Sequence, residues 1–163
     1  MLGKQLKFMS MHNKFYILVL STMLLCTFTG CNNNEPENFS GNVSKPTWSV
    51  PSNYDYSSSM TAVIKVDLAA QYPSLAAEWQ IQSDDLLAAF VEGECIGVAT
   101  LLDNGLFNLY LSSPSQGSGK VTLRYYSAYF KNLFVAIDAF VFKNDSHLGT
   151  VAAPFTPKFV LEK

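Results

Sequence analysis

Histidine, cysteine and arginine are scarce in this chain. Beyond residue 31 the sequence has one histidine, His147, one cysteine, Cys95, and one arginine, Arg124. One thiol and one imidazole cannot supply the four ligands of a structural zinc site, and a lone cysteine forms no intramolecular disulfide. The stability of the folded part must therefore come from a packed core.

Positive charge is also scarce in the part of the chain that we expect to fold. Lys4, Lys7 and Lys14 all precede residue 31, which leaves eight basic residues against thirteen acidic ones, a net charge of −5. Binding of nucleic acid without sequence preference depends on lysine and arginine side chains that neutralise phosphates. We therefore expect no nucleic-acid partner and no basic patch for anionic lipid.

The sequence has no apolar run that is long enough for a permanent spanning helix. The most apolar stretch, Phe15 to Leu25, is interrupted by Ser21 and Thr22 and is shorter than the roughly 20 residues that a transmembrane helix needs. A basic start, a short apolar stretch and small residues at the end are typical of a secretory signal. Residues 1–30 are therefore predicted to be a signal peptide.

Thr29-Gly30-Cys31 resembles the end of bacterial lipoprotein leaders, in which small residues precede the cysteine that receives lipid. Phe28 departs from the usual leucine, and the competing Cys26 follows the bulky Leu25. The resemblance implies acylation of Cys31, including palmitate, and anchoring to the outer membrane, with the domain on either its periplasmic or its outer face. Each buried methylene of such a chain contributes about 0.8 kcal/mol of membrane affinity. The alternative is an ordinary secretory leader that ends near a cysteine.

After Cys31 the composition changes twice. Residues 31–53 are rich in Asn, Ser, Pro and Glu, a composition that buries too little apolar surface to offset the entropy of ordering. We expect this segment to be a flexible tether. Residues 54–163 have the length of a single domain, and a chain of this size buries roughly two thirds of its unfolded surface.

Alternating apolar residues dominate the predicted domain. Apolar side chains at every second position from Met60 to Leu68 predict a strand with one buried face. Glu92-Gly93-Glu94 separates the apolar runs Leu86–Val91 and Cys95–Leu102, and Asp103-Asn104-Gly105 follows. Short turns that contain glycine, above all Asn-Gly, are typical of β-hairpins. We expect a meander here, with its third strand at Leu106–Leu111.

The remaining apolar runs complete an all-β pattern. Further strands are predicted around Val121–Tyr126, Leu133–Ile137 and Ala139–Phe142, and a proline-bearing edge strand at Phe155–Leu161. Tyr72–Trp79 is the one candidate for a short helix. About eight short strands indicate an antiparallel β-sandwich, immunoglobulin-like or similar to a carbohydrate-binding module. The predicted core is Ile64, Val66, Phe90, Val98, Leu109, Leu123 and Phe140.

Residues 85–99, DLLAAFVEGECIGVA, resemble a module found in envelope and secreted proteins of Gram-negative gut anaerobes. The usual module has Asp, an aliphatic residue, Gly-Ala-Phe-Val, a short turn, Glu-Cys-Arg and Gly-Val-Ala; here Ala88 replaces the glycine and Ile96 the arginine. Val121–Tyr125 and Leu148-Gly149-Thr150 with Pro154 are similar to its later motifs. The resemblance covers about residues 48–161 and implies a β-sandwich of surface proteins without a defined reaction.

Few residues could support catalysis or metal binding, and we expect neither an enzyme nor a cofactor. Cys95 has only His147 as a base and is expected to be a small buried residue in a strand. His147 beside Asp145 and Ser146 lacks a nucleophile-elbow pattern. Asp84-Asp85 and Glu92-Gly93-Glu94 flank one strand and so lie about 20 Å apart, too far for a glycosidase pair. Asp84, Asp85 or Asp103 could join a calcium site, but capping of turns is the preferred interpretation.

Aromatic side chains, including Trp48, Tyr54 and Tyr56, are the best candidates for ligand binding. Trp79, Tyr126 and Tyr129 are the predicted ligand-binding residues, with Tyr126 first because it is out of phase with the apolar Val121, Leu123 and Tyr125. The alternative is that these rings cover a neighbouring loop. The sequence thus favours a non-enzymatic, lipid-anchored protein that binds a glycan or another envelope protein. A structural subunit of an envelope assembly, with no ligand of its own, is the alternative function.

Overall fold

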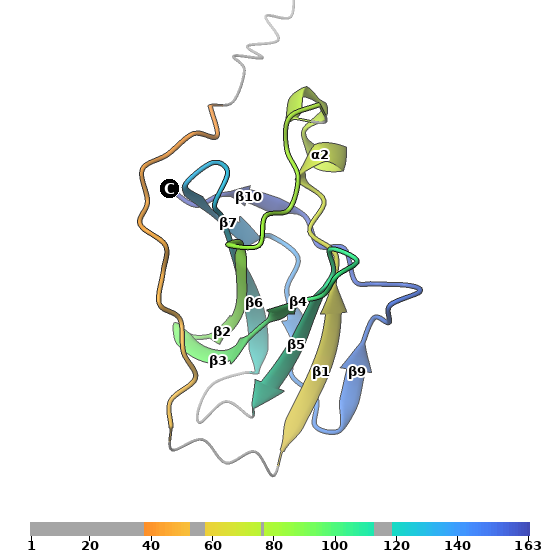
Figure 1. Ribbon diagram of the computed structural model, residues 1–163. Helices are drawn as coiled ribbons and strands as arrows, with labels where there is room; N and C mark the ends of the chain where they lie inside the picture. Colours follow the sequence, from red (N-terminus) through yellow and green to blue (C-terminus); the bar gives the residue numbers. More distant parts are fainter. Residues whose placement is uncertain (1–37, 53–57, 76, 113–118) are drawn as a thin grey trace, which may run out of the picture. The chain divides into compact units, whose positions relative to one another are not determined.

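The computed structural model describes residues 38–52, 58–75, 77–112 and 119–163. The described residues belong to a compact unit that extends from Asn38 to Lys163. Two β-sheets pack against each other in this unit, as Figure 1 shows, and the predicted all-β sandwich is confirmed. The predicted signal peptide and Cys31 lie outside the described residues, and no described helix is long and apolar enough to cross a membrane.

The four-stranded sheet has the order β4-β5-β1-β9. Its strands are β1 (Ser59–Ile64), β4 (Thr100–Leu101), β5 (Phe107–Ser112) and β9 (Ser146–Leu148). β1 pairs antiparallel with β5 and parallel with β9, so the predicted antiparallel sandwich contains one parallel strand pair. β9 follows a turn at Asn144–Asp145 and starts beside Met60 at the beginning of β1. The two strands therefore run in the same direction.

The second sheet has the order β10-β7-β6-β2-β3. It contains β2 (Leu86–Val91), β3 (Glu94–Val98), β6 (Lys120–Ser127), β7 (Asn132–Ala136) and β10 (Phe159–Leu161), and β8 (Phe140–Val141) pairs with the start of β6. β10 lies at an edge, as its neighbouring proline predicted. The described strands number ten rather than about eight, because short strands such as β4 and β9 escape a pattern search.

Both predicted hairpin turns are present. Glu92 and Gly93 adopt positive φ angles of 48° and 89°, and Gly105 adopts 75°. The run Cys95–Leu102, expected as one strand, instead divides into β3 and β4, which belong to different sheets. Gly97 permits this crossing, because a Cβ atom there would lie 2.6 Å from the carbonyl oxygen of Tyr110 in β5.

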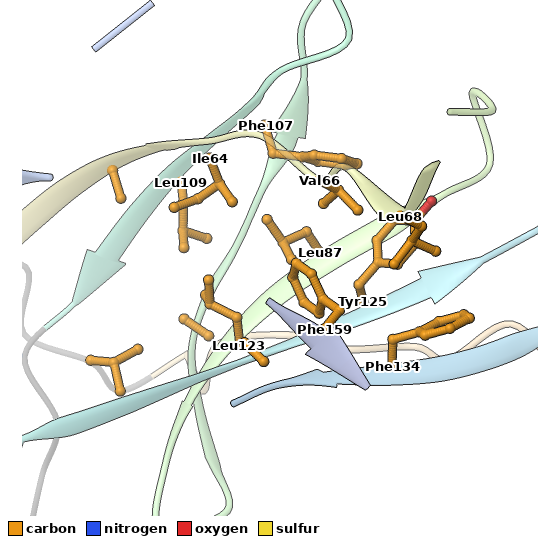
Figure 2. Packing of buried hydrophobic residues seen from close by; sticks show 14 of the residues in the cluster. Ile64, Val66, Leu68, Leu87, Phe107, Leu109, Leu123, Tyr125, Phe134 and Phe159 are labelled. Carbon is orange, nitrogen blue, oxygen red and sulfur yellow. The ribbon is translucent and has the colours of Figure 1, made fainter. Parts of the chain in front are cut away.

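The core lies between the sheets, as Figure 2 shows. Every second residue of β1 is buried, and Ile64, Val66, Leu109 and Leu123 of the predicted core are confirmed. Val98 and Phe140 are half-buried. Phe90 is buried outside this core cluster, on the outer face of the six-stranded sheet.

Among the described residues, helical structure is limited to α2 (Leu68–Gln71) and the 3-10 turn η1 (Pro73–Leu75). The range Tyr72–Trp79, predicted as a short helix, contains the 3-10 turn, whereas the α-helix comes before it. Asp67 caps α2 by accepting a hydrogen bond from the backbone N–H of Ala70 at 3.0 Å. Pro73 lacks an N–H group and cannot continue the α-helix.

Residues 38–52, which we call the strap, pack along the domain rather than hanging free from it. Phe39 is 3% exposed, and its ring centroid lies 4.7 Å from that of Tyr72 and 5.8 Å from that of Phe130. The N–H groups of Gly41 and Val43 donate to the carbonyl oxygens of Phe130 and Lys131 at 2.8 and 2.9 Å. The tether predicted for residues 31–53 is corrected over this range, and the domain starts at Asn38 rather than at residue 54. The polar composition concealed two aromatic side chains, Phe39 and Trp48, that contact the domain.

Candidate functional site

The strap closes the face on which Tyr126 was expected to bind a ligand. Tyr126 is only 5% exposed, and its hydroxyl donates to the carbonyl oxygen of Val43 in the strap at 3.4 Å. Trp48 of the strap meets Phe90 edge-on at 5.7 Å between ring centroids. The Arg124 guanidinium lies 5.0 Å from the centre of the same Phe90 ring. The outward phase of Tyr126 was predicted correctly, but a segment distant in sequence covers it.

Trp79 is also unavailable to a ligand. Its side chain is 8% exposed and belongs to the core cluster. The prediction that Trp79 presents an exposed ring is therefore corrected. The chain turns toward the core after the 3-10 turn η1. The Trp79 N–H donates to the Leu75 carbonyl oxygen at 3.0 Å and so stabilises this turn.

Tyr129 is the one predicted ligand-binding residue that the structure leaves open to solvent. It is 46% exposed in the turn between β6 and β7, and its ring stands edge-on to Phe130 at 4.9 Å. Tyr54 and Tyr56, two further aromatic candidates, lie outside the described residues.

The candidate catalytic groups do not come together. Cys95 is half-buried with its Sγ atom 3.7 Å from the Gly97 carbonyl oxygen, and burial raises the pKa of its thiol. His147 Nδ1 hydrogen-bonds with the Thr61 hydroxyl, whereas the Ser146 hydroxyl donates to the Lys143 carbonyl oxygen. His147, the base that was considered for both sites, is thus paired with Thr61, and Ser146 and His147 do not form a nucleophile pair.

The acidic residues Asp84 and Asp103 lie apart, one in an ion pair and the other at a surface hollow. Asp84 forms an ion pair with Lys45 of the strap at 2.7 Å. Asp103 lines a hollow of about 440 Å³ with Ile81, Leu101 and other residues of the β4–β5 turn, and this lining contains no second carboxylate. Within the described part of the chain, no three His, Cys, Asp or Glu side chains gather closely enough to hold a metal ion.

Asp85 is buried, and its carboxyl oxygens accept three hydrogen bonds. Its Oδ2 atom accepts from the Tyr125 hydroxyl at 2.5 Å and from the Gln82 N–H at 2.9 Å, and its Oδ1 atom accepts from the Ala128 N–H at 2.8 Å. Removal from water raises the pKa of this carboxyl, although the three hydrogen bonds oppose the shift. The interpretation of Asp85 as a capping residue fits these contacts.

The outer face of the four-stranded sheet is the best candidate for a binding site. Tyr110 on β5 is 48% exposed and lies directly opposite Thr61 of β1, which in turn lies opposite His147 of β9. Cross-strand neighbours lie on the same face of a sheet, so these three side chains form a row across β5, β1 and β9. Figure 1 shows the three strands side by side.

A second row lies beside the first. Asn108 pairs with Thr100 of β4 on one side and with Val63 of β1 on the other. Thr100 and Asn108 are exposed, and Val63 is half-buried. We call the two rows together the platform; its residues are Thr61, Val63, Thr100, Asn108, Tyr110 and His147.

A shallow groove lies beside Thr61 and His147, between the starts of β1 and β9. The groove has a volume of about 220 Å³ and is lined by Ser59, Met60, Thr61, Asp145, Ser146 and His147. The turn at Asn144–Asp145 is tied to the start of β1, because Asn144 Oδ1 accepts from the Ser59 N–H at 2.9 Å and the Asp145 N–H donates to the Ser59 carbonyl oxygen at 2.8 Å. One side-chain contact and one backbone contact thus hold the two sides of the groove together.

Sequence reasoning missed Tyr110 although a signal was present. Phe107, Leu109 and Leu111 point into the core, and Asn108 and Tyr110 alternate with them. The same alternation selected Tyr126. Tyr126 and Tyr110 differ in the position of the strap. Among the described residues, the strap covers the outer face of the six-stranded sheet, which bears Tyr126, and not that of the four-stranded sheet, which bears Tyr110.

Comparisons with known proteins add no relative to this picture. No family model, no curated protein and no solved structure matches the chain.

Proposed function

We propose that this protein is a non-enzymatic, lipid-anchored envelope protein whose β-sandwich binds a glycan or a protein partner through the platform. The observation that carries the proposal is the 48% exposed side chain of Tyr110 beside hydrogen-bonding side chains on the outer face of the four-stranded sheet. An aromatic ring offers both an apolar face and a polar edge, a combination that is common in binding surfaces. Cys31, predicted from its leader, supplies the anchor.

The test is a binding screen with the chain from residue 31, carrying Cys31→Ala so that the protein stays in solution. It is applied to plant and host polysaccharides and to envelope fractions. Tyr110→Ala should abolish any saturable binding. Tyr129→Ala is the matched control, because Tyr129 is almost equally exposed but lies in the β6–β7 turn. Flat responses in the whole screen would refute the binding proposal.

The anchor is tested separately in cells. Cells that express the full chain should incorporate radioactive palmitate into this protein, and Cys31→Ala should remove the label. A Cys26→Ala variant is the control and should stay labelled. Label that persists in the Cys31→Ala variant would show that the lipid is attached elsewhere.

A structural role in an envelope assembly is the second candidate. Ile137, directly after β7, and Val141 in β8 are exposed apolar side chains, and burying such side chains against another protein would favour association. Crosslinking in cells should then recover one dominant partner, and Val141→Asp should release it while Tyr110→Ala does not. Recovery of the protein as an uncrosslinked monomer would exclude this role.

A further inference from the structure

We infer that the β6–β7 turn, residues 128–131, is the surface through which the anchored domain contacts the lipid bilayer, with the Tyr129 ring among the lipid headgroups. This inference rests on the proposed function, because it requires the lipid on Cys31. It follows from the place where the chain enters the domain, from the length of the segment that joins this place to Cys31, and from the side chains of the turn.

The chain enters the domain directly beside this turn. The Gly41 N–H donates to the Phe130 carbonyl oxygen at 2.8 Å, and Asn132 Nδ2 donates to the Phe39 carbonyl oxygen at 3.2 Å. The rings of Phe39 and Phe130 also pack together, with 5.8 Å between their centroids. The start of the strap at Asn38 and the β6–β7 turn therefore lie at the same end of the domain.

The segment between Cys31 and the domain limits which end of the domain can approach the lipid. Cys31 and Asn38 are seven positions apart, a distance of at most about 25 Å along an extended chain. β6 has eight residues and so extends over about 23 Å between Lys120 and Ser127. Contact through the end where β6 starts would therefore require nearly the whole length of this segment, whereas contact through the β6–β7 turn requires little of it.

The turn has one aromatic side chain in the core and one in the solvent. Phe130 is 7% exposed and packs against Phe39, whereas Tyr129 is 46% exposed. Asp85 Oδ1 accepts a hydrogen bond from the Ala128 N–H at 2.8 Å. These contacts fix the backbone of the turn, so Tyr129 can contact a surface with little further loss of conformational freedom.

Tyr129 and Lys131 have the chemistry of residues at a membrane interface. A tyrosine side chain has an apolar body and a polar tip, and tyrosine is enriched at the level of the lipid headgroups. Lys131 is exposed in the same turn. Its aliphatic stem can lie along apolar surface while its ammonium group pairs with a lipid phosphate.

Two carboxylates near this end of the domain are paired with cations. Asp84 forms an ion pair with Lys45 of the strap at 2.7 Å. Glu162, whose N–H donates to the Leu133 carbonyl oxygen at 2.9 Å, forms an ion pair with Arg124 at 3.0 Å. These carboxylates therefore repel anionic headgroups less strongly than unpaired ones would.

The contact is too weak to hold the domain on a membrane without the lipid. Even a single myristoyl chain gives only marginal binding, and one tyrosine and one lysine bury far less apolar surface. We therefore expect the turn to orient an anchored domain rather than to recruit a free one. The Cys31→Ala protein should stay in solution, where Tyr129→Ala serves as the control for binding to the platform.

Contact through this turn would direct the groove of the platform away from the bilayer. Figure 1 shows that β1 and β9 start at the end of the domain opposite to the β6–β7 turn and α2. Ser59 begins β1, Asp145 directly precedes β9, and both line the groove. A partner outside the bilayer could therefore reach the groove while the domain stays on the membrane.

The experiment uses the lipidated protein from cells that express the full chain with Cys95→Ala, which leaves no other free thiol after Cys31. A nitroxide is attached at Lys131→Cys or at Asp145→Cys, and the protein is placed in vesicles of phosphatidylethanolamine and phosphatidylglycerol. Electron paramagnetic resonance measures collisions of the label with a nickel chelate in water and with oxygen, which is enriched in the bilayer. Compared with the soluble Cys31→Ala protein, the label at position 131 should meet the chelate less often, by about threefold or more, because the bilayer interior excludes water. The label at position 145 should not change.

Variants assign the contact to the Tyr129 ring. Tyr129→Asp should return the label at position 131 to the water access that it has in the soluble protein, because a carboxylate loses solvation among the lipids. Tyr129→Trp should keep the protection, since tryptophan is also enriched at membrane interfaces. Val151→Asp is the matched control: Val151 is 59% exposed in the loop after β9, and its replacement should leave the label protected. Both positions are exposed, so the unfolding midpoints of these variants should equal that of the unchanged protein.

The outcomes separate this inference from the proposed function. If the protein carries palmitate on Cys31 but its label at position 131 is as accessible to water as the label at position 145, the contact is rejected and the anchor stays. Protection of position 145 in place of position 131 would show that the domain lies the other way round. Protection that Tyr129→Asp does not change would reject the role of the ring. A protein without lipid on Cys31 would overturn the proposed anchor together with this inference.

Discussion

Asp85 connects three parts of the domain through a single buried carboxyl group. Its oxygens accept hydrogen bonds from the loop before β2, from Tyr125 in β6 and from Ala128 in the turn after β6. Burial disfavours the ionised carboxylate and raises the pKa of Asp85 and of the neighbouring Tyr125. Asp85 thus has a structural role, because it joins these three parts of the domain.

We expect Asp85→Asn to lower the free energy of unfolding by about 2–3 kcal/mol, because an amide has a single acceptor oxygen and leaves one of the buried donors unpaired. The difference should depend on pH. The folded protein holds the Asp85 proton more tightly than the unfolded chain, whose carboxyl has a pKa near 3.8. The stability that proton binding contributes is therefore present at and below pH 3.8 and is lost as the pH rises through the folded-state pKa.

Urea unfolding at pH 4 and pH 7, followed by tryptophan fluorescence, measures this difference. The advantage of the unchanged protein over Asp85→Asn should be larger at pH 4. Asp84→Asn is the control: Asp84 is exposed and pairs only with Lys45, so its replacement should leave stability nearly unchanged. An advantage that grows toward pH 7 would mean that the hydrogen bonds outweigh burial and lower the pKa.

At the scale of the elements, Gly149 holds the end of β9 against β1. Its φ angle is 70°, and a Cβ atom there would lie 2.5 Å from the Phe155 nitrogen and 2.7 Å from the Val63 carbonyl oxygen. These two atoms form a hydrogen bond of 2.9 Å, and the Lys65 N–H donates to the Phe155 carbonyl oxygen at 2.9 Å. The glycine thus allows the segment after β9 to pair with the end of β1.

Gly149→Ala should therefore lower the free energy of unfolding by about 3 kcal/mol or more, from the strain of a positive φ angle together with a backbone collision. Gly93→Ala measures the strain of a positive φ angle without the backbone collision. Gly93 has a φ angle of 89° and nothing within 4 Å of its would-be Cβ, so this variant should lose only about 1 kcal/mol. Thermal and urea unfolding of the two variants measure the difference; equal losses would show that the collision at Gly149 is relieved by a small shift.

The elements that the sequence predicts best are those whose evidence is local. Alternation placed the buried face of β1, and glycines placed the two hairpin turns, because side-chain phase and positive φ are properties of a few adjacent residues. The split of Cys95–Leu102 between two sheets depends instead on how closely Gly97 approaches Tyr110, and the parallel position of β9 depends on where β1 begins. Neither feature can be predicted from the side chains of a few adjacent residues.

Some features of the candidate site could also be predicted from local sequence, and others could not. Phase correctly placed Tyr126 on the outer face of its sheet, and Tyr110 could have been found by the same alternation. Whether an outward side chain is exposed depends on what covers the sheet, and the cover is a segment more than eighty residues away from Tyr126 along the chain. Composition identified that segment as a tether because its few aromatic residues are diluted by Asn, Ser and Pro.

At the scale of the whole molecule, the packing of the strap shortens the segment that can separate the predicted lipid from the domain. Residues from Asn38 onward belong to the compact unit, so only the residues between Cys31 and Asn38 are left as a possible tether. An extended chain spans at most about 3.6 Å per residue, which limits a tether of this length to about 25 Å. The strap also leaves the platform as the open sheet face among the described residues.

The strap should stabilise the domain mainly through Phe39, whose ring contacts Tyr72, Phe130 and Phe134. We expect Phe39→Ala to lower the free energy of unfolding by about 2–4 kcal/mol, because it empties a buried aromatic position. It should also speed amide hydrogen exchange at Gly41 and Val43, whose hydrogen bonds tie the strap to the β6–β7 turn. Val43→Ala is the control, since that side chain is exposed. If Phe39→Ala changed neither stability nor exchange, the strap would be only loosely associated with the domain, and the outer face bearing Tyr126 would have to be reconsidered as a binding surface.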